Sequence, residues 1–213
     1  MIPRALDVQL ATAHVRVADA AMAEFIDRAG PYTPRLPQGD PFRALVRAIV
    51  FQQLAGRAAA AIHARVLAAV GGEMTPAAVL ATPVDVLCRA GLSAAKAASL
   101  VDLATKSADG TLALDRLAEL DDEEIVARLV AVRGIGRWTA QMFLLFELQR
   151  PDVWPIDDLG VRAGYGVIYR LPDVIRARDL AGAGERFRPY RSLVALYCWH
   201  ALHLARGTQP ITG

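Results

Sequence analysis

The sequence has 213 residues, which is enough to bury a sizeable core in one domain or in two small ones. Hydrophobic residues make up 54% of the chain and charged residues 22%, a composition that excludes disorder for most of it. The formal net charge is +2, with 22 arginines against two lysines. Codon bias in a GC-rich genome explains such an arginine excess, so the charge is compatible with DNA binding without requiring it.

The N-terminal segment, residues 1–17, has a charged residue every few positions. It lacks the apolar core and the small-residue cleavage site of a signal peptide. Elsewhere Arg, Gln, Asp or His interrupts every apolar stretch before it reaches the roughly 18 to 20 residues of a membrane span. We therefore expect a protein of the cytoplasm, at the bacterial nucleoid, with no membrane partner.

The rest of the sequence predicts an all-α protein, because Ala, Leu and Arg dominate and alternating β-branched runs are missing. Capping residues precede prolines at Asp40-Pro41, Thr75-Pro76 and Thr82-Pro83, and Asp121 with Glu124 has the pattern of a capping box. One helix is expected after Asp40 and another after Gly56. Further helices are expected at about 19–29, 76–80, 83–89, 93–106, 122–131, 137–149, 158–169 and 190–205.

The stretch from Ile125 to Phe146 predicts two helices joined by a very short hairpin, in which Gly134 and Gly136 flank Ile135. Each glycine permits backbone angles that a side chain would forbid. Backbone N–H groups would converge where the second helix begins and where its dipole adds partial positive charge, which favours phosphate. The alternative is an ordinary glycine-rich turn. The predicted DNA-backbone site consists of Arg133, Gly134, Ile135, Gly136, Arg137 and Thr139.

This hairpin resembles the helix-hairpin-helix element of the base-excision DNA glycosylase superfamily. Further segments are similar to the DNA-3-methyladenine glycosylase II branch, and the resemblance covers about residues 40 to 205. It implies the helix-hairpin-helix glycosylase fold, with two small helical subdomains and the active site between them, and without the extra N-terminal α/β domain of two-domain members. The similar segments are AIVFQQLAGRAAAAIHARV at 48–66, GLSAAKAASLVDLA at 91–104, WPIDDLGVR at 154–162 and RPYRSLVALYCWHA at 188–201.

The resemblance also implies a function: a monofunctional glycosylase that excises alkylated bases, of the 3-methylpurine and 7-methylpurine type, from duplex DNA in base excision repair. Such an enzyme extrudes the damaged nucleotide and must fill the gap that it leaves. By resemblance Leu54 is the wedge and Gln53 is its polar neighbour that faces the opposite strand. Leu54 begins a loop before Ala55-Gly56, which suits an exposed tip better than a core position.

In the superfamily a catalytic aspartate follows the hairpin after a short helix and a loop, and Asp158 stands there, 24 residues after Gly134. Cleavage at C1′ develops oxocarbenium character, which a carboxylate stabilises while it orients the attacking water. The alternative is that Asp157-Asp158 only caps the next helix. The two roles are compatible, because an N-cap site favours the ionised carboxylate. We expect Asp158 to be catalytic and Asp157 to cap or support the loop.

The base pocket is expected at Trp138, Trp199, Met142 and Leu159. Lyase members of the superfamily carry a lysine where Trp138 stands, so no Schiff base is expected and water is the nucleophile. An aromatic face also attracts the positive charge of an alkylated base. Trp199 matches the second pocket tryptophan of the branch. Met142 and Leu159 fall where two-domain members typically carry aromatic residues, which makes this pocket less aromatic.

We expect residues 1–39 to form an N-terminal helix and loop that packs with the C-terminal helices. Residues 40–130 are expected to form a helical subdomain with the wedge, and residues 131–213 to contain the hairpin, the catalytic aspartate loop and the C-terminal helices. No cofactor is required, although by resemblance the carbonyls of Val130, Val132 and Ile135 could hold a Na⁺ or K⁺ ion. The expected partner is double-stranded damaged DNA, bound by a monomer.

Three alternatives to this function stay open. The first is a non-catalytic helix-hairpin-helix DNA-binding module, against which Asp158 and Trp138 argue. The second is a glycosylase for another damaged purine; the missing hairpin lysine argues against oxidised bases, and the missing cysteine cluster argues against some mismatch enzymes. The third is a purely structural helical bundle, which leaves the Gly-Ile-Gly turn unexplained.

Overall fold

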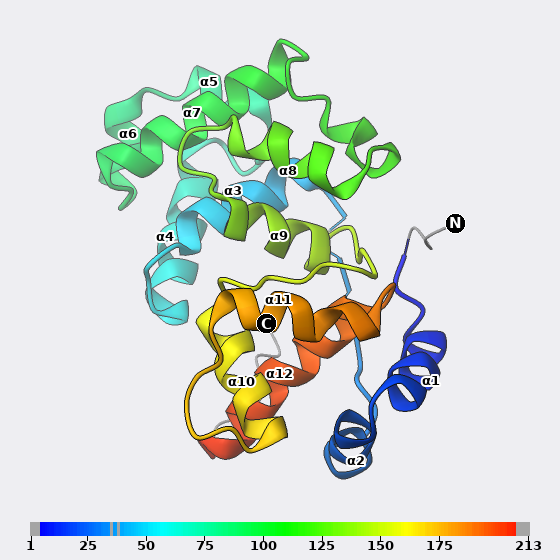
Figure 1. Ribbon diagram of the computed structural model, residues 1–213. Coiled ribbons are helices and arrows are strands. Elements are labelled where there is room, and N and C mark those ends of the chain that lie inside the picture. Colours follow the sequence, from blue (N-terminus) through cyan, green and yellow to red (C-terminus); the bar gives the residue numbers. More distant parts are fainter. Residues whose placement is uncertain (1–4, 35, 38, 208–213) are drawn as a thin grey trace. The chain divides into compact units, whose positions relative to one another are not determined.

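A computed structural model describes residues 5–34, 36–37 and 39–207, and every regular element among them is a helix (Figure 1). The all-α prediction is confirmed. None of the helices in this part of the chain is long and apolar enough to cross a membrane. The α-helices are α1 (Val8–Ala18), α2 (Ala20–Ala29), α3 (Pro41–Phe51), α4 (Gly56–Ala69), α5 (Pro76–Ala81), α6 (Val84–Arg89), α7 (Ala94–Ala108), α8 (Asp122–Val130), α9 (Arg137–Phe146), α10 (Leu159–Tyr169), α11 (Ala177–Gly184) and α12 (Arg191–Ala205). Two short 3-10 helices span Leu114–Glu119 and Glu185–Phe187.

The predicted helix starts are right where a side chain reaches the free N–H groups of the first turn. The Asp40 carboxylate accepts from two N–H groups of α3, and the Thr75 hydroxyl accepts from the Ala78 N–H of α5. At α6 the prediction is wrong: Pro83 is the N-cap, and the Thr82 hydroxyl donates back to the Ala78 carbonyl at 2.8 Å. The capping box at α8 is also wrong, because the Asp121 side chain makes no capping hydrogen bond.

Two helices, α1 and α11, were not predicted. Helix α1 begins after Asp7, whose carboxylate accepts from two backbone N–H groups, and it buries only Ala11 and Val15. Helix α11 contains Gly182 and Gly184, and glycine disfavours helix. Gly184 is required by packing, because a Cβ there would lie 2.3 Å from the indole nitrogen of Trp154. Tertiary contact therefore overrides local propensity in α11.

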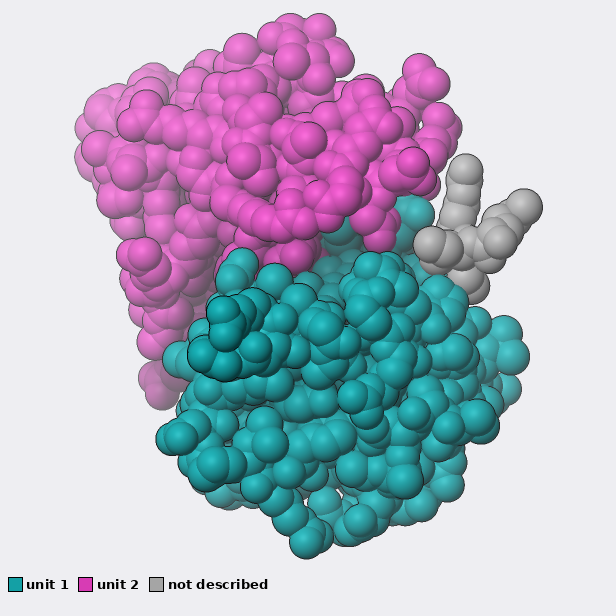
Figure 2. Space-filling view, viewed as in Figure 1, with its two compact units in different colours: residues 1–37, 144–213 teal, residues 38–143 magenta. Residues whose placement is uncertain are grey.

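The chain divides into two compact units (Figure 2). One contains residues 1–37 and 144–213, in which α1 and α2 contact α12 and α10 packs along α12. A Cβ at Gly164 of α10 would lie 1.8 Å from the Cys198 carbonyl oxygen, so these two helices touch backbone to backbone. The other unit contains residues 38–143, in which α3, α5 and α6 contact α7, and α3 also contacts α4.

The boundary between the units falls within α9, between Phe143 and Leu144. The boundary predicted from the sequence lies at residue 130 instead and groups the hairpin with the C-terminal helices. The hairpin belongs with residues 38–143 because its backbone is bonded there. The Arg133 N–H donates to Asp102 Oδ2 at 2.8 Å, and Gln52 Nε2 donates to the Gly134 carbonyl at 3.0 Å.

Candidate active site and DNA-binding hairpin

Asp158 is the N-cap of α10. Its Oδ1 accepts the backbone N–H of Val161 at 2.7 Å, which satisfies one of the donors that a helix N-terminus leaves open. The side chain is half-buried, and the dipole of α10 stabilises negative charge at this position. Asp157 is exposed and does not cap the helix, so the capping role expected for Asp157 falls to Asp158.

Trp199 of α12 holds the same carboxylate. Its indole Nε1–H donates to Asp158 Oδ1 at 2.9 Å, and the indole is half-buried. Gly160, in the first turn of α10, makes room for this contact: a Cβ there would lie 2.7 Å from the Trp199 ring and 3.1 Å from Asp158 Oδ1. The structure thus brings the expected catalytic residue and one expected pocket residue together. Leu159, which lies between Asp158 and Gly160, is 65% exposed.

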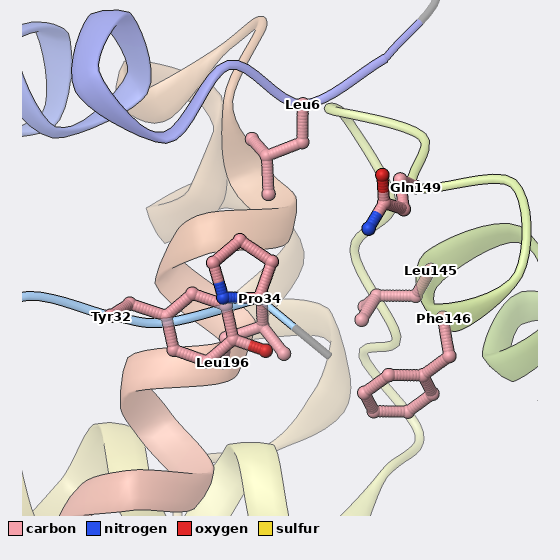
Figure 3. A pocket seen from close by; sticks show the side chains of 7 residues that line it. All are labelled: Leu6, Tyr32, Pro34, Leu145, Phe146, Gln149 and Leu196. Atoms are coloured by element: carbon pink, nitrogen blue, oxygen red, sulfur yellow. The ribbon is translucent and has the colours of Figure 1, made fainter. Parts of the chain in front are cut away.

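Phe146, at the end of α9, stacks on Trp199 with ring centroids 5.9 Å apart and an interplanar angle of 23°. This residue is not predicted from the sequence, because an aromatic among the apolar residues of α9 is typical of a core position. Phe146 also lines a small pocket, together with Leu145 of α9 and Leu196 of α12 (Figure 3). The other residues lining this pocket are Leu6, Tyr32, Pro34 and Gln149.

The hairpin differs in one respect from what its two glycines predict. Gly134 has a φ of +76°, and a Cβ there would lie 2.4 Å from Ser99 Oγ, so this position requires glycine. Gly136 does not have a positive φ, and a Cβ there would meet nothing within 4 Å. The expectation of special backbone angles at Gly136 is therefore wrong. Because Gly136 has no side chain, the backbone at the start of α9 faces open space.

The remaining hairpin residues divide into exposed and buried ones. Arg133 and Arg137 are exposed, and Arg137 forms an ion pair with Glu123. The Ile135 side chain is buried, and its N–H donates to the Val132 carbonyl at 3.1 Å. Thr139 is only 6% exposed, and its hydroxyl oxygen lies 3.4 Å from Gln52 Nε2. The Thr139 side chain thus contacts protein, whereas a phosphate contact was expected.

The loop between α3 and α4, residues 52–55, carries the expected wedge residue and is called the wedge loop below. Leu54 is 40% exposed, and Gln53 has a φ of +56°, a left-handed conformation that costs free energy in a residue other than glycine. In the same unit, Trp138 is 49% exposed in the first turn of α9, and Met142 is half-buried one turn later. The expected wedge and the expected stacking tryptophan are therefore surface residues of residues 38–143.

The chain is similar to known repair proteins along most of its length. Residues 46–187 match HhH-GPD, described as a superfamily of base excision DNA repair proteins. DNA-3-methyladenine glycosylase 1 of Schizosaccharomyces pombe is 34% identical over 203 residues, which cover 93% of this chain and 89% of the relative.

Two solved structures extend this similarity to the fold. The 3-methyladenine DNA glycosylase of S. pombe in complex with abasic DNA matches with a TM-score of 0.79 and 31% identity over 92% of this chain and 96% of that one. A DNA-3-methyladenine glycosidase of Bacillus halodurans matches with a TM-score of 0.86 and 30% identity over 93% and 92%. The chain therefore belongs to the HhH-GPD superfamily of base excision DNA repair proteins, in its DNA-3-methyladenine glycosylase branch.

Proposed function

We propose that this protein is a monofunctional DNA glycosylase that releases alkylated purines, of the 3-methyl and 7-methyl type, from damaged duplex DNA. The observation that carries the proposal is the Asp158 carboxylate, half-buried at the N-terminus of α10 and bonded to the Trp199 indole. Relatives named as 3-methyladenine glycosylases support the substrate class, and the complex of one of them with abasic DNA supports a DNA partner.

The chemistry follows from the charge of this carboxylate. As the C1′–N bond breaks, its electron pair leaves with the base, and the alkylated base loses its positive charge. The sugar acquires oxocarbenium character, which Asp158 stabilises until water adds to C1′ and passes its extra proton to the solvent. Val161 and Trp199 both donate to Oδ1, so the carboxylate is held in place before the reaction begins. A cationic base leaves readily, and the mechanism needs no strong general acid.

Aromatic side chains account for the preference for alkylated purines. Trp199 and Phe146 form a stacked pair beside Asp158. A positively charged base is attracted to such ring faces by about 0.5 to 2 kcal/mol beyond ordinary stacking. By resemblance, Trp138 is proposed as a further residue that stacks on the base. Because it stands where lyase members carry lysine, the abasic strand is left intact.

The test is an excision assay on methylated DNA, which contains 3-methyladenine and 7-methylguanine, and on duplexes with 1-methyladenine, hypoxanthine or ethenoadenine. We expect free methylated base, an intact abasic strand and no covalent complex with borohydride. A trapped complex would show an amine nucleophile and overturn monofunctional hydrolysis. Release of hypoxanthine alone would favour the glycosylase for another purine. DNA binding without any release would favour the non-catalytic module.

Duplex DNA is proposed to be held by the backbone N–H groups of Gly134 and Gly136 on either side of Ile135, with Arg133 and Arg137 nearby. Carbonyl oxygens of Val130, Val132 and Ile135 are the ligand type that Na⁺ and K⁺ accept. The Val132 oxygen already accepts one N–H and has a second lone pair for a cation. Such an ion would add positive charge beside the phosphate. Duplex affinity in K⁺, Na⁺ and tetramethylammonium at equal ionic strength tests it, and equal affinities would reject the ion.

We further propose that the protein acts as a monomer in the cytoplasm, at the bacterial nucleoid. Repair of DNA requires access to DNA, which supports this location. A glycosylase of this kind contacts one lesion at a time, which one copy of the chain is enough to do. Sedimentation of the protein with and without a single-lesion duplex tests the stoichiometry. A two-to-one complex on that duplex would contradict the monomer.

A further inference from the structure

Both lysines of the chain lie on α7, whereas all 22 arginines lie elsewhere in the sequence. Lys96 and Lys106 share one face of this helix with Ser99 and Asp102, because three- and four-residue steps return to the same side. This face contacts the wedge loop and the hairpin, all within residues 38–143. The segment containing α7 resembles the glycosylase branch, yet the proposed chemistry assigns it no role.

Lys96 binds the C-terminal end of α3. Its ammonium donates to the carbonyl oxygens of Val50 and Gln52, both at 2.7 Å. The last carbonyls of a helix lack partners within the helix, and a cation there also interacts favourably with the helix dipole. The ammonium is compact and has three donors, so one group can bind two converging carbonyls, whereas a planar guanidinium presents its donors in a fixed fork. Burial lowers the pKa of Lys96, so the group is partly desolvated.

Gln52 connects the wedge loop to the hairpin. Its carbonyl is bound by Lys96, while its side-chain amide donates to the Gly134 carbonyl at 3.0 Å and lies 3.4 Å from Thr139 Oγ1. The residue is half-buried and stands two positions before Leu54. The main chain of the wedge loop is thus held on one side by α7 and on the other by the hairpin.

The hairpin is held by the same face of α7. Asp102 accepts the Arg133 N–H through Oδ2 and pairs with Lys106 through Oδ1. Burial raises the pKa of Asp102, but the Lys106 ammonium and the Arg133 N–H outweigh this effect and leave the pKa lowered. Ser99 lies against Gly134 and leaves room only for glycine. One helix face therefore supports both expected DNA contacts.

We propose that Lys96 is a positioning residue for base extrusion: through the two carbonyls at the end of α3 it fixes the height of Leu54 relative to the hairpin. The inference rests on the proposed wedge role of Leu54. When the hairpin grips the phosphates, a fixed wedge enters the stack at a defined depth. A wedge loop free to retreat would no longer compensate for the stacking and pairing lost on extrusion.

The experiment compares Lys96→Met with Lys106→Met, which removes an ammonium from the same helix face at the hairpin end. Single-turnover excision is measured for one lesion, paired in a duplex and unpaired in a bulge, where extrusion is already cheaper. For Lys96→Met we expect excision about 10-fold slower on the paired lesion, little change on the bulged lesion and unchanged affinity for undamaged duplex. For Lys106→Met we expect weaker affinity for every duplex and an unchanged ratio of paired to bulged rates.

Gln52→Leu removes the amide donors at the other end of the same connection, and it decides the question if Lys96→Met does not fold. Gln52→Leu should lower the excision rate on the paired lesion selectively. The double variant, with both Lys96→Met and Gln52→Leu, should be no slower than the slower of the two single variants, because both substitutions break the same connection. Equal losses on paired and bulged lesions, or no loss, would overturn the inference. Leu54→Ala in the same assay separates the failures: if it shifts the ratio and Lys96→Met does not, only the positioning role is wrong. If Leu54→Ala leaves the ratio unchanged, the wedge itself is wrong.

Discussion

Trp199 donates its indole N–H to the Asp158 oxygen that also accepts the first-turn N–H of α10, at 2.9 Å and 2.7 Å. One carboxylate oxygen therefore joins α12 to the N-terminus of α10, while Phe146 stacks on the Trp199 ring. Because both donors use Oδ1, an amide oxygen can replace it as acceptor without the charge. The geometry and the charge of this site can thus be altered separately.

Asp158→Asn tests the charge. The asparagine oxygen can accept both hydrogen bonds, so the melting temperature should change little and damaged DNA should still bind. The loss of one preorganised electrostatic contact costs roughly 2.7 to 4 kcal/mol, and single-turnover excision should fall about 10²- to 10³-fold. Asp157→Asn is the matched control, because Asp157 is exposed and does not cap α10. A slow Asp157 variant beside an active Asp158 variant would contradict the assignment.

Trp199→Phe tests the geometry. Phenylalanine keeps a ring against Phe146 but cannot donate to the carboxylate. The carboxylate then loses the indole donor at Oδ1, so the single-turnover rate should fall about tenfold while the affinity for damaged duplex stays unchanged. Trp154→Phe is the control: this buried indole donates to the Leu180 carbonyl, and its loss should lower stability without slowing single-turnover excision. An unchanged single-turnover rate in Trp199→Phe would contradict the positioning role.

These contacts show what the sequence can and cannot predict. The cap at Asp40 was predictable, because donor and acceptor lie within three residues. The hydrogen bond from Trp199 to Asp158 joins residues 41 positions apart and depends on how α10 packs against α12. The resemblance to the glycosylase family implied a role for each of the two residues, but it did not predict the hydrogen bond between them. Phe146 was missed for the same reason, since no local pattern separates an aromatic that stacks on a site from one that fills the core.

Alanine substitutions at two glycines test the close packing of α10 against α12, one at a position where a Cβ would overlap a neighbour and one where it would meet nothing. In Gly164→Ala the new methyl would overlap the Cys198 carbonyl, so α10 and α12 must move apart, at a cost on the order of 3 kcal/mol. In Gly182→Ala nothing lies within 4 Å, and alanine should stabilise α11 by about 0.5 to 1 kcal/mol. Urea unfolding measures both. Similar free energies of unfolding for the two variants would contradict the close packing of α10 and α12.

His63 should make stability depend on pH. Burial, and secondarily the charge of Arg47, lowers the pKa of this histidine below its ordinary value of 6.5. Between the lowered pKa and 6.5 the unfolded chain binds a proton that the folded protein does not, so stability falls as pH drops below 6.5 and is unaffected above it. His63→Gln should flatten this part of the curve of unfolding free energy against pH. An unchanged slope would contradict the shift.

The two hairpin glycines should fail in different ways when substituted. Gly134→Ala combines a φ of +76° with overlap on Ser99 Oγ, so it should lower stability by at least about 1 to 2 kcal/mol, of which Ser99→Ala restores the part due to overlap. At Gly136 the φ is not positive and an added Cβ would meet nothing within 4 Å, so Gly136→Val should fold normally. Its side chain would stand where a phosphate approaches the N–H groups of α9, so affinity for undamaged duplex should fall about tenfold at low salt. The slope of log affinity against log salt should also shrink by about one phosphate contact. Wild-type affinity in Gly136→Val, or salt-independent binding by the unaltered protein, would mean that the hairpin backbone does not grip DNA.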